Sequence, residues 1–254
     1  MDFTRPKRVE VMGAPIDPMT MDETIECACR FIESGSFAHF IGVNADKYLQ
    51  MKDDSFIDEI VRKCEVINAD GASIVMAAHT LGIDVPERVT GIDLMIELCS
   101  KLEKENVGIY LLGAKQDIVE KTAACLFEQF PELSIVGIHN GYFEETDYSD
   151  IVKNIKDSGA SVVFVGITSP KKERLIEYFR SRGLVGVFVG VGGSFDVISG
   201  EIARAPMWIQ KAKLEWLFRM AKEPKRLFRR YIVGNTRFMA LLAKEKLTNK
   251  RLAA

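Results

Sequence analysis

Two short stretches decide the fold of this chain: GIYLLG at residues 108–113 and SVVFVG at residues 161–166. Both are almost wholly apolar and bounded by glycine or serine. Such runs are typical of strands that helices cover on both faces, as in parallel sheets. They also direct the search for a ligand site, because parallel sheets bind ligands beyond the carboxyl ends of their strands.

Outward from these stretches, strand-like and helix-like segments alternate through the first two hundred or so residues. Short β-branched runs predict strands at residues 9–13, 37–43, 65–69, 107–113, 133–138, 161–166 and 185–191. Apolar residues at helical spacing predict helices at residues 21–33, 47–63, 73–81, 92–103, 116–129, 148–157 and 170–182. This alternation predicts an α/β fold with a mostly parallel sheet and helices on both faces.

Length and composition narrow the class of protein. Of the 254 residues, 47% are hydrophobic and 28% charged, which provides a core and excludes a disordered, collagen-like or coiled-coil chain. No apolar run reaches the roughly 18 residues of a membrane-spanning helix. The opening residues lead into a strand-like segment without the apolar stretch of a signal peptide. We therefore expect a cytoplasmic protein.

Metal and cofactor chemistry have little support in the sequence. The five cysteines form no CxxC pair, so we expect reduced thiols. The three histidines form no HExxH or HxH arrangement. The chain also lacks the DxD triplet that holds a divalent cation against a diphosphate, and the GxxxxGK(S/T) phosphate loop. We expect neither a metal nor a cofactor.

The net charge of −2 hides a division along the chain. From Arg204 onward there are 14 Lys and Arg against 3 Glu, a net charge of +11, which leaves −13 on the first 203 residues. Residues 207–246 predict helices interrupted at Pro224 and Gly234, with apolar stripes flanked by basic side chains. We therefore divide the chain into an α/β domain, 1–204, and a basic amphipathic helical appendage, 205–254.

Two interpretations of the appendage stay open. Its apolar and basic faces suit an anionic lipid surface, an acidic surface, nucleic acid or a phosphorylated substrate. The alternative is a helical cap that packs on the core and exposes a solvated charged face. The charge imbalance favours the first interpretation.

The residues that follow expected strands are the candidates for chemistry. Asp70 either acts as a general base or caps the next helix by accepting backbone N–H bonds, and Asp46 and Asn44 have the same ambiguity. The run from Gly190 to Gly193 lets backbone amides approach a phosphate or a flat heterocycle. It is not the GxGxxG dinucleotide fingerprint, so NAD binding is a weak alternative.

Arginine is the residue type that could neutralise a diphosphate without a metal. Its guanidinium fork matches phosphate oxygens and keeps its charge at any working pH. Each arginine alone can equally be a surface solubility group. The candidates are Arg88, Arg204, Arg219, Arg226 and Arg229.

A set of short motifs, in order from about Val9 to Arg237, resembles the WecG/TagA/CpsF glycosyltransferases. The motifs are Asn44-Ala45-Asp46, ADG at 69–71, ERVTG at 87–91, YLLG at 110–113, NGYF at 140–143, SPKKE at 169–173, GVGGSFD at 190–196, RAP at 204–206, and EWLFR at 215–219 followed by Glu223, Pro224 and Arg226. Together they are far more specific than any one of them.

The resemblance implies a Rossmann-like fold of the GT-E type and a metal-independent, inverting transferase. Members typically move N-acetylmannosamine or its uronic acid from UDP to N-acetylglucosamine on undecaprenyl diphosphate, for teichoic acid, enterobacterial antigen or capsule. The resemblance implies that Asp70 is the base. It also implies that Arg219, Arg226 and Arg229 close over the diphosphate at the membrane. The substrate-binding residues that it implies are Asn44, Gly71, Arg88, Gly113, Tyr142, Lys172, Glu173, Gly192, Gly193, Asp196 and Arg204.

Two positions depart from the family pattern. Many relatives have a threonine two residues before the asparagine, where this chain has Gly42. They have Pro-Lys-Gln-Glu where this chain has Lys172 in place of the glutamine. The added cation suits either an acidic donor sugar or a further phosphate contact.

We therefore expect a glycosyltransferase whose α/β domain carries catalysis and whose appendage holds it peripherally on the inner face of the cell membrane. Its partners would be a UDP-sugar, first of all UDP-N-acetylmannosamine, an undecaprenyl-diphosphate-linked acceptor and an anionic membrane surface, without nucleic acid. Whether it forms a homo-oligomer stays open. The alternatives are another UDP-hexose or uronic acid donor, a non-catalytic nucleotide-binding scaffold and, more weakly, an NAD-dependent oxidoreductase.

Overall fold

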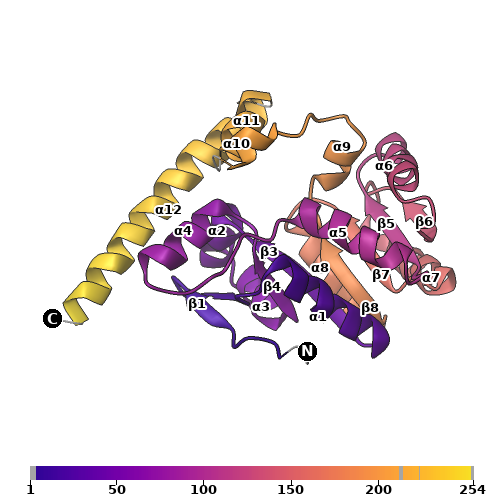
Figure 1. The fold of residues 1–254 in the computed structure, drawn as a ribbon, viewed down its shortest axis with the longest axis horizontal. Coiled ribbons are helices and arrows are strands. Elements are labelled where there is room, and N and C mark those ends of the chain that lie inside the picture. The colour runs from indigo at the N-terminus through magenta and orange to yellow at the C-terminus, as the bar shows by residue number, and fades with distance from the viewer. Residues whose placement is uncertain (1–3, 212–213, 223, 253–254) are drawn as a thin grey trace.

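The computed structural model describes residues 4–211, 214–222 and 224–252 of the chain (Figure 1). Its centre is a six-stranded sheet in the order β4-β3-β8-β7-β5-β6, and each pair of neighbours is parallel. The strands are β3 (Phe37–Val43), β4 (Val66–Ala69), β5 (Ile109–Gly113), β6 (Ile135–His139), β7 (Val162–Gly166) and β8 (Gly186–Gly190). The predicted Rossmann-like α/β fold is confirmed, with a main sheet that is parallel throughout.

Helices connect these strands and continue after the last one. They are α1 (Met21–Glu33), α2 (Ala45–Asp53), α3 (Ser55–Lys63), α4 (Ala72–Thr80), α5 (Gly91–Glu103), α6 (Gln116–Gln129), α7 (Tyr148–Ser158), α8 (Lys171–Ser181), α9 (Ser194–Ile198), α10 (Met207–Lys211), α11 (Glu215–Lys222) and α12 (Pro224–Leu252). A short 3-10 helix, Glu145–Asp147, precedes α7.

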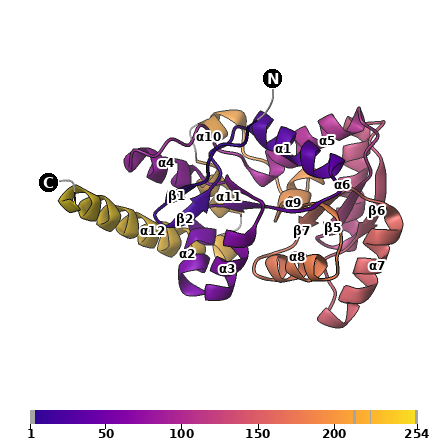
Figure 2. The same ribbon diagram turned by 90° about the horizontal axis from the view of Figure 1, so that it is seen from below.

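Different helices cover the two faces of the sheet. Helices α1, α5 and α6 pack on the face to which Phe40 of β3 and Val189 of β8 point. Helices α2, α3, α7 and α8 pack on the other face. Ile41, which follows Phe40, and Phe188, which precedes Val189, point to that face. This alternation follows from the two-residue period of a strand. Figure 2 shows α1 and α5 on one side of the strands and α8 on the other.

Two predicted elements are divided in the structure. The single helix expected over residues 47–63 is wrong, because Asp54 separates α2 from α3 and caps α3 by accepting a hydrogen bond from the Phe56 N–H. The strand expected over residues 9–13 is a hairpin of β1 (Val9–Val11) and β2 (Ala14–Ile16). Its turn residues, Met12 and Gly13, both have positive φ, as a tight two-residue hairpin requires.

The break predicted at Gly234 is also wrong, since α12 continues through it. Pro224 is the first residue of α12, where its missing N–H removes no intrahelical bond. A Cβ built on Gly234 lies 3.7 Å from Cδ1 of Leu49 in α2. The glycine thus lies at the contact between the two helices, and α12 tolerates the roughly 1 kcal/mol that glycine costs in a helix interior.

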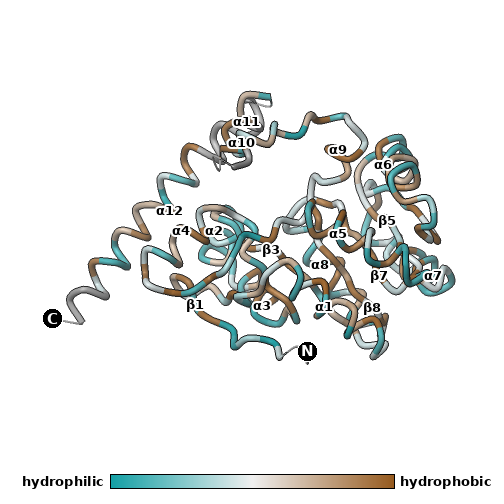
Figure 3. Tube along the Cα trace, viewed as in Figure 1, coloured by the Kyte–Doolittle hydropathy of each residue, from teal (hydrophilic) through white to brown (hydrophobic). Residues whose placement is uncertain are grey.

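Part of the predicted appendage belongs to the hydrophobic core. Phe238 and Leu242 of α12 are buried in the cluster formed by β3, β4 and α2 to α4. The Phe238 ring meets the Tyr48 ring edge-on at 5.4 Å between centroids, and Arg237 binds Asp53 with two hydrogen bonds of 2.6 Å. Hydrophilic and hydrophobic stretches alternate along α12 in Figure 3. Within the described residues, no helix combines the length and apolarity needed to cross a membrane.

Candidate functional site

Asp70 lies directly after β4, at the carboxyl edge of the sheet. Its N–H donates to the carbonyl of Val43 at 3.0 Å, which extends the pairing of β4 with β3 by one residue. A Cβ built on Gly42 of β3 would lie 2.6 Å from the Cβ of Asp70. The absence of a side chain at position 42 therefore makes room for the Asp70 carboxyl group.

Asn44 joins Asp70 to the start of α2. Its Oδ1 accepts the Lys47 N–H at 3.0 Å and so caps α2, while its Nδ2 donates to Oδ2 of Asp70 at 3.2 Å. A Cβ built on Gly71 would lie 2.7 Å from the Cβ of Asn44, so glycine is needed for this approach. Asn44 is both a cap and a partner of Asp70. The N-cap of α4 is Gly71, so Asp70 does not hold the cap position.

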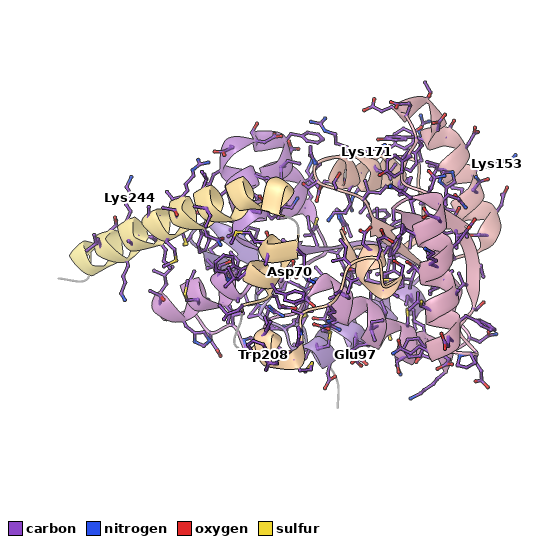
Figure 4. The ribbon with its side chains drawn as sticks, turned by 90° about the horizontal axis from the view of Figure 1, so that it is seen from above. Asp70, Glu97, Lys153, Lys171, Trp208 and Lys244 are labelled. Carbon is purple, nitrogen blue, oxygen red and sulfur yellow. The ribbon has the colours of Figure 1, made fainter. Side chains whose placement is uncertain are left out.

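Arg88 lies beside this edge and connects it to the C-terminal helices. The following residue, Val89, donates its N–H to the carbonyl of Ala69 at 3.0 Å, which fixes this segment against the end of β4. The Arg88 guanidinium pairs with the Glu215 carboxylate of α11 at 2.5 Å, with both side chains largely buried. Figure 4 labels Asp70 and, on α10, Trp208.

The other predicted arginines differ in what the structure says of them. Arg204 pairs with Asp93 in the first turn of α5, close to the segment that carries Arg88. Arg219 belongs to α11, and Arg226 and Arg229 belong to α12. Their side chains lie outside the described residues. The structure therefore places two arginines, Arg88 and Arg204, in ion pairs with carboxylates around the carboxyl edge.

Lys172 and Glu173, at the start of α8, belong to a buried ion cluster. Nζ of Lys47 donates to Glu173 at 2.7 Å and to Ser169 at 2.6 Å, and Nζ of Lys172 lies 3.5 Å from the same Glu173 oxygen. Burial opposes ionisation of Glu173, but the two ammonium groups lower its pKa to about 2. Burial lowers the pKa of Lys47, against the attraction of Glu173. Glu173 is fully buried, so its visible role is to hold the two lysines.

The ammonium of Lys172 lies against the end of β8. A Cβ built on Gly190 would meet Cε and Nζ of Lys172 at 2.9 Å. The loop that follows carries Gly192, with φ of 54°, and Gly193, whose built Cβ lies 3.6 Å from Oδ2 of Asp196. Gly193 and Asp196 are therefore neighbours, and Lys172 lies at the strand end that leads to them.

Gly113 and Tyr142 lie toward the other edge of the sheet. A Cβ built on Gly113 would be 2.4 Å from the carbonyl oxygen of Gly166, which explains the glycine at the end of β5. Tyr142 follows β6, the edge strand opposite β4, and is 72% exposed. Its loop turns back toward α8, where the Lys171 ammonium lies 4.3 Å from the centre of the Phe143 ring. No described contact joins Tyr142 to Asp70.

Sequence reasoning assigned no role to Lys47. Ser169 and Glu215 open the SPKKE and EWLFR motifs, but their contacts were not predicted. Lys47 and Ser169 are 122 residues apart in sequence, and no local pattern pairs them. Sequence reasoning also missed a groove of about 560 Å³. The groove is lined by Asp46, Leu49, Gln50, Asp53, Asp54, Ile57, Pro170, Val233, Gly234 and Arg237, and none of the predicted site residues lines it. The candidate site is thus defined by contacts around Asp70. No group of three or more His, Cys, Asp or Glu arranged for a metal occurs in the part of the chain that the structure describes.

A parallel α/β sheet with helices on both faces places the chain in the Rossmann-like class, whose members bind ligands beyond the carboxyl ends of the strands. The model of the glycosyl transferase WecG/TagA/CpsF family matches residues 9–252, nearly the whole chain, and the chain belongs to this family. It is therefore a glycosyltransferase. A substrate-binding periplasmic protein from Ralstonia solanacearum is similar over 72% of this chain and 53% of its own, with 14% identity and a TM-score of 0.31. That likeness is too low to support an argument.

Proposed function

We propose that the chain transfers a sugar, first of all N-acetylmannosamine, from UDP to N-acetylglucosamine carried on undecaprenyl diphosphate, with inversion and without a metal. The product would be a lipid-linked disaccharide for a cell-surface polysaccharide or teichoic acid. The observation that carries the proposal is the setting of Asp70, which Gly42 accommodates and Asn44 orients at the carboxyl edge. The family membership supplies the reaction class.

Asp70 would be the general base. In an inverting displacement the acceptor hydroxyl attacks the anomeric carbon from the side opposite UDP, and one base takes the hydroxyl proton. Asn44 donates to Oδ2 of Asp70, so Oδ1 is the oxygen left to accept that proton. Gly71 permits this arrangement by its lack of a side chain.

Arginines would stabilise the departing diphosphate. A guanidinium matches phosphate oxygens and offsets the charge that develops on the leaving group. Arg88 and Arg204 lie at the carboxyl edge, and we assign the same role to Arg219, Arg226 and Arg229 of the C-terminal helices. Lys172, Gly192, Gly193 and Asp196 at the end of β8, with Gly113 and Tyr142 farther along the edge, complete the proposed donor site.

The C-terminal helices would also bring the enzyme to the inner face of the cell membrane. Met207 and Trp208 of α10 are 63% and 69% exposed, and the segment from Arg204 onward carries a net charge of +11. Exposed apolar side chains in a cationic segment bind anionic bilayers, where a lipid-linked acceptor resides. The chain would thus meet its acceptor at the surface of the membrane.

UDP release with a synthetic polyprenyl-diphosphate-linked N-acetylglucosamine and a panel of UDP-sugars tests this proposal. We expect turnover with at least one N-acetylhexosamine or uronic acid donor. We also expect Asp70→Asn to lower kcat by about a thousandfold or more while UDP still binds. Asp157→Asn, which removes an exposed carboxylate near the end of α7, is the matched control. UDP binding without turnover on any donor would support the scaffold alternative instead.

A further inference from the structure

The ion pair between Arg88 and Glu215 stands out against the charge pattern of the C-terminal segment. From Arg204 onward the chain has 14 basic residues and only 3 acidic ones, and Glu215 is one of these 3. An acidic residue there weakens attraction to an anionic surface. Its position is explained by the partner that it finds in the α/β core.

The Arg88–Glu215 ion pair is short and largely shielded from solvent. The two charged atoms are 2.5 Å apart, and the side chains are only 23% and 17% exposed. A pair at this burial is screened less by solvent and salt than a surface pair. Removing one partner leaves the other charge largely desolvated without compensation.

The pair joins α11 to the edge that carries Asp70. Arg88 precedes Val89, whose N–H is bound to the carbonyl of Ala69, the residue before Asp70. Glu215 is the first residue of α11, and the Leu217 and Phe218 N–H groups both bond back to the Leu214 carbonyl. The ion pair therefore links the start of α11 directly to the segment that is bound to the end of β4.

The other ion pairs described between the segment and the core lie farther away along the chain. Arg204 pairs with Asp93 before α10, and Arg237 pairs with Asp53 beyond the middle of α12. Both use an arginine of the segment and an aspartate of the core. Between them, the Arg88–Glu215 pair has the opposite polarity and is the ion pair described for α11.

We propose that Glu215 is a positioning residue, which through Arg88 fixes α11 at the carboxyl edge of β4 in the arrangement needed for transfer. Its contact orients the Arg88 guanidinium at the same time, because the fork has further N–H donors for a phosphate oxygen. The effect on turnover rests on the proposed function. The docking of α11 does not.

Hydrogen exchange of the peptides covering α10 and α11, in the full chain without substrate, tests the docking. We expect faster exchange in Glu215→Gln and in Arg88→Gln. Protection should return in the charge-swapped double variant, Arg88→Glu with Glu215→Arg. Glu245→Gln, which removes the same charge from α12, should leave these peptides unchanged. Unchanged exchange in Glu215→Gln, or a swap that restores no protection, would overturn the proposal.

Turnover with the lipid-linked acceptor tests the positioning role. We expect Glu215→Gln to lower kcat about tenfold, which corresponds to ~1.4 kcal/mol, while the Kd for UDP stays within about twofold and Tm is preserved. Glu215→Asp, which keeps the charge, should recover part of the loss. A kcat equal to that of Glu245→Gln contradicts the positioning role. Absence of turnover in the wild-type protein would instead count against the proposed function, because the exchange experiment still decides the docking.

Discussion

The side chain of Asn44 binds Asp70 across two neighbouring strands, with Nδ2 of the asparagine 3.2 Å from Oδ2 of the aspartate. The same asparagine caps α2 through its Oδ1. The helix therefore fixes the asparagine, and the asparagine fixes one oxygen of the carboxylate. This linkage leads to a direct test of the role of Asp70.

Asn44→Asp should move the pH dependence of turnover. Aspartate caps a helix as well as asparagine does, so the fold is kept. A second carboxylate at hydrogen-bond distance opposes ionisation of the pair. We expect the acidic limb of the kcat/KM profile to move to higher pH by about one unit, measured by UDP release. Asp157→Asn, at an exposed position in α7, is the control, and an Asn44→Asp profile that matches the wild type would argue against Asp70 as the base.

Gly42→Ala should lower turnover without loss of the fold. The new Cβ would lie 2.6 Å from the Cβ of Asp70, closer than real carbon atoms approach, so the carboxylate must shift. A displacement of about 1 Å in a catalytic group can cost on the order of 100-fold in rate. Gly234→Ala, whose built Cβ has an ordinary contact of 3.7 Å, is the matched control. Equal kcat values in both variants would show that Asp70 needs no space at Gly42.

Much of this architecture could be predicted from the sequence, for a physical reason. Strands that are buried on both faces appear in the sequence as apolar runs, such as residues 161–166. The helices between them show apolar residues at helical spacing. Asn44 and Asp70 were placed at strand ends by the same pattern. Their hydrogen bond depends on β3 and β4 being neighbours, which the structure shows.

The parts of the structure that could not be predicted depend on contacts between residues that are far apart along the chain. Glu173 and Lys47 are 126 residues apart, and the pattern of α8 or α2 alone does not pair them. The positive charge of the C-terminal segment likewise directs attention to its surface, although Phe238 is buried against Tyr48. Net charge describes what a segment attracts, and it gives no sign that Phe238 and Leu242 of α12 pack into the core.

Lys172→Gln should change the preference among donors. The Lys172 ammonium is largely buried at the end of β8, and its described ion pair with Glu173 is long, at 3.5 Å. A cation in this setting favours a ligand with a carboxylate or an additional phosphate contact. We expect the variant to lose at least fivefold in kcat/KM for a UDP-linked uronic acid relative to the neutral sugar. An equal loss for both donors would assign Lys172 to the diphosphate, and no loss would remove it from the site.

The buried His39 should contribute to the dependence of stability on pH. Burial lowers the pKa of His39 to about 3, against about 6.5 in an unfolded chain. Between these values the unfolded chain binds a proton that the folded protein does not, so the free energy of unfolding decreases as pH falls from about 6.5 toward 3. The lowered pKa of Glu173, about 2, adds a further decrease below about 4.5 by the same linkage.

Urea unfolding at a series of pH values measures this effect in His39→Asn. The new amide keeps a polar group near Nδ1, which lies 3.3 Å from Sγ of Cys64, and removes the unpartnered Nε2. We expect a shallower decrease in unfolding free energy between pH 6.5 and 4.5 than in the wild type. His79→Asn, at an exposed position in α4, should follow the wild-type curve. Parallel curves for all three proteins would contradict the assignment to His39.

Trp208 and Phe238 of the C-terminal segment should respond differently to substitution, because Trp208 is exposed and Phe238 is buried. Trp208→Ser removes an aromatic ring that is 69% exposed, so we expect several-fold weaker binding to vesicles containing anionic lipid and an unchanged Tm. Phe238→Ala empties a buried site against Tyr48, so we expect about 3–5 kcal/mol of destabilisation, with vesicle binding by the folded fraction retained. Vesicle sedimentation and urea unfolding on the same preparations separate the two effects.

Truncation after Arg204 cannot separate the two effects, because it removes the buried Phe238 together with the exposed Trp208. If Trp208→Ser binds vesicles as the wild type does, α10 is not the membrane contact, and the appendage is better described as a helical cap on the core.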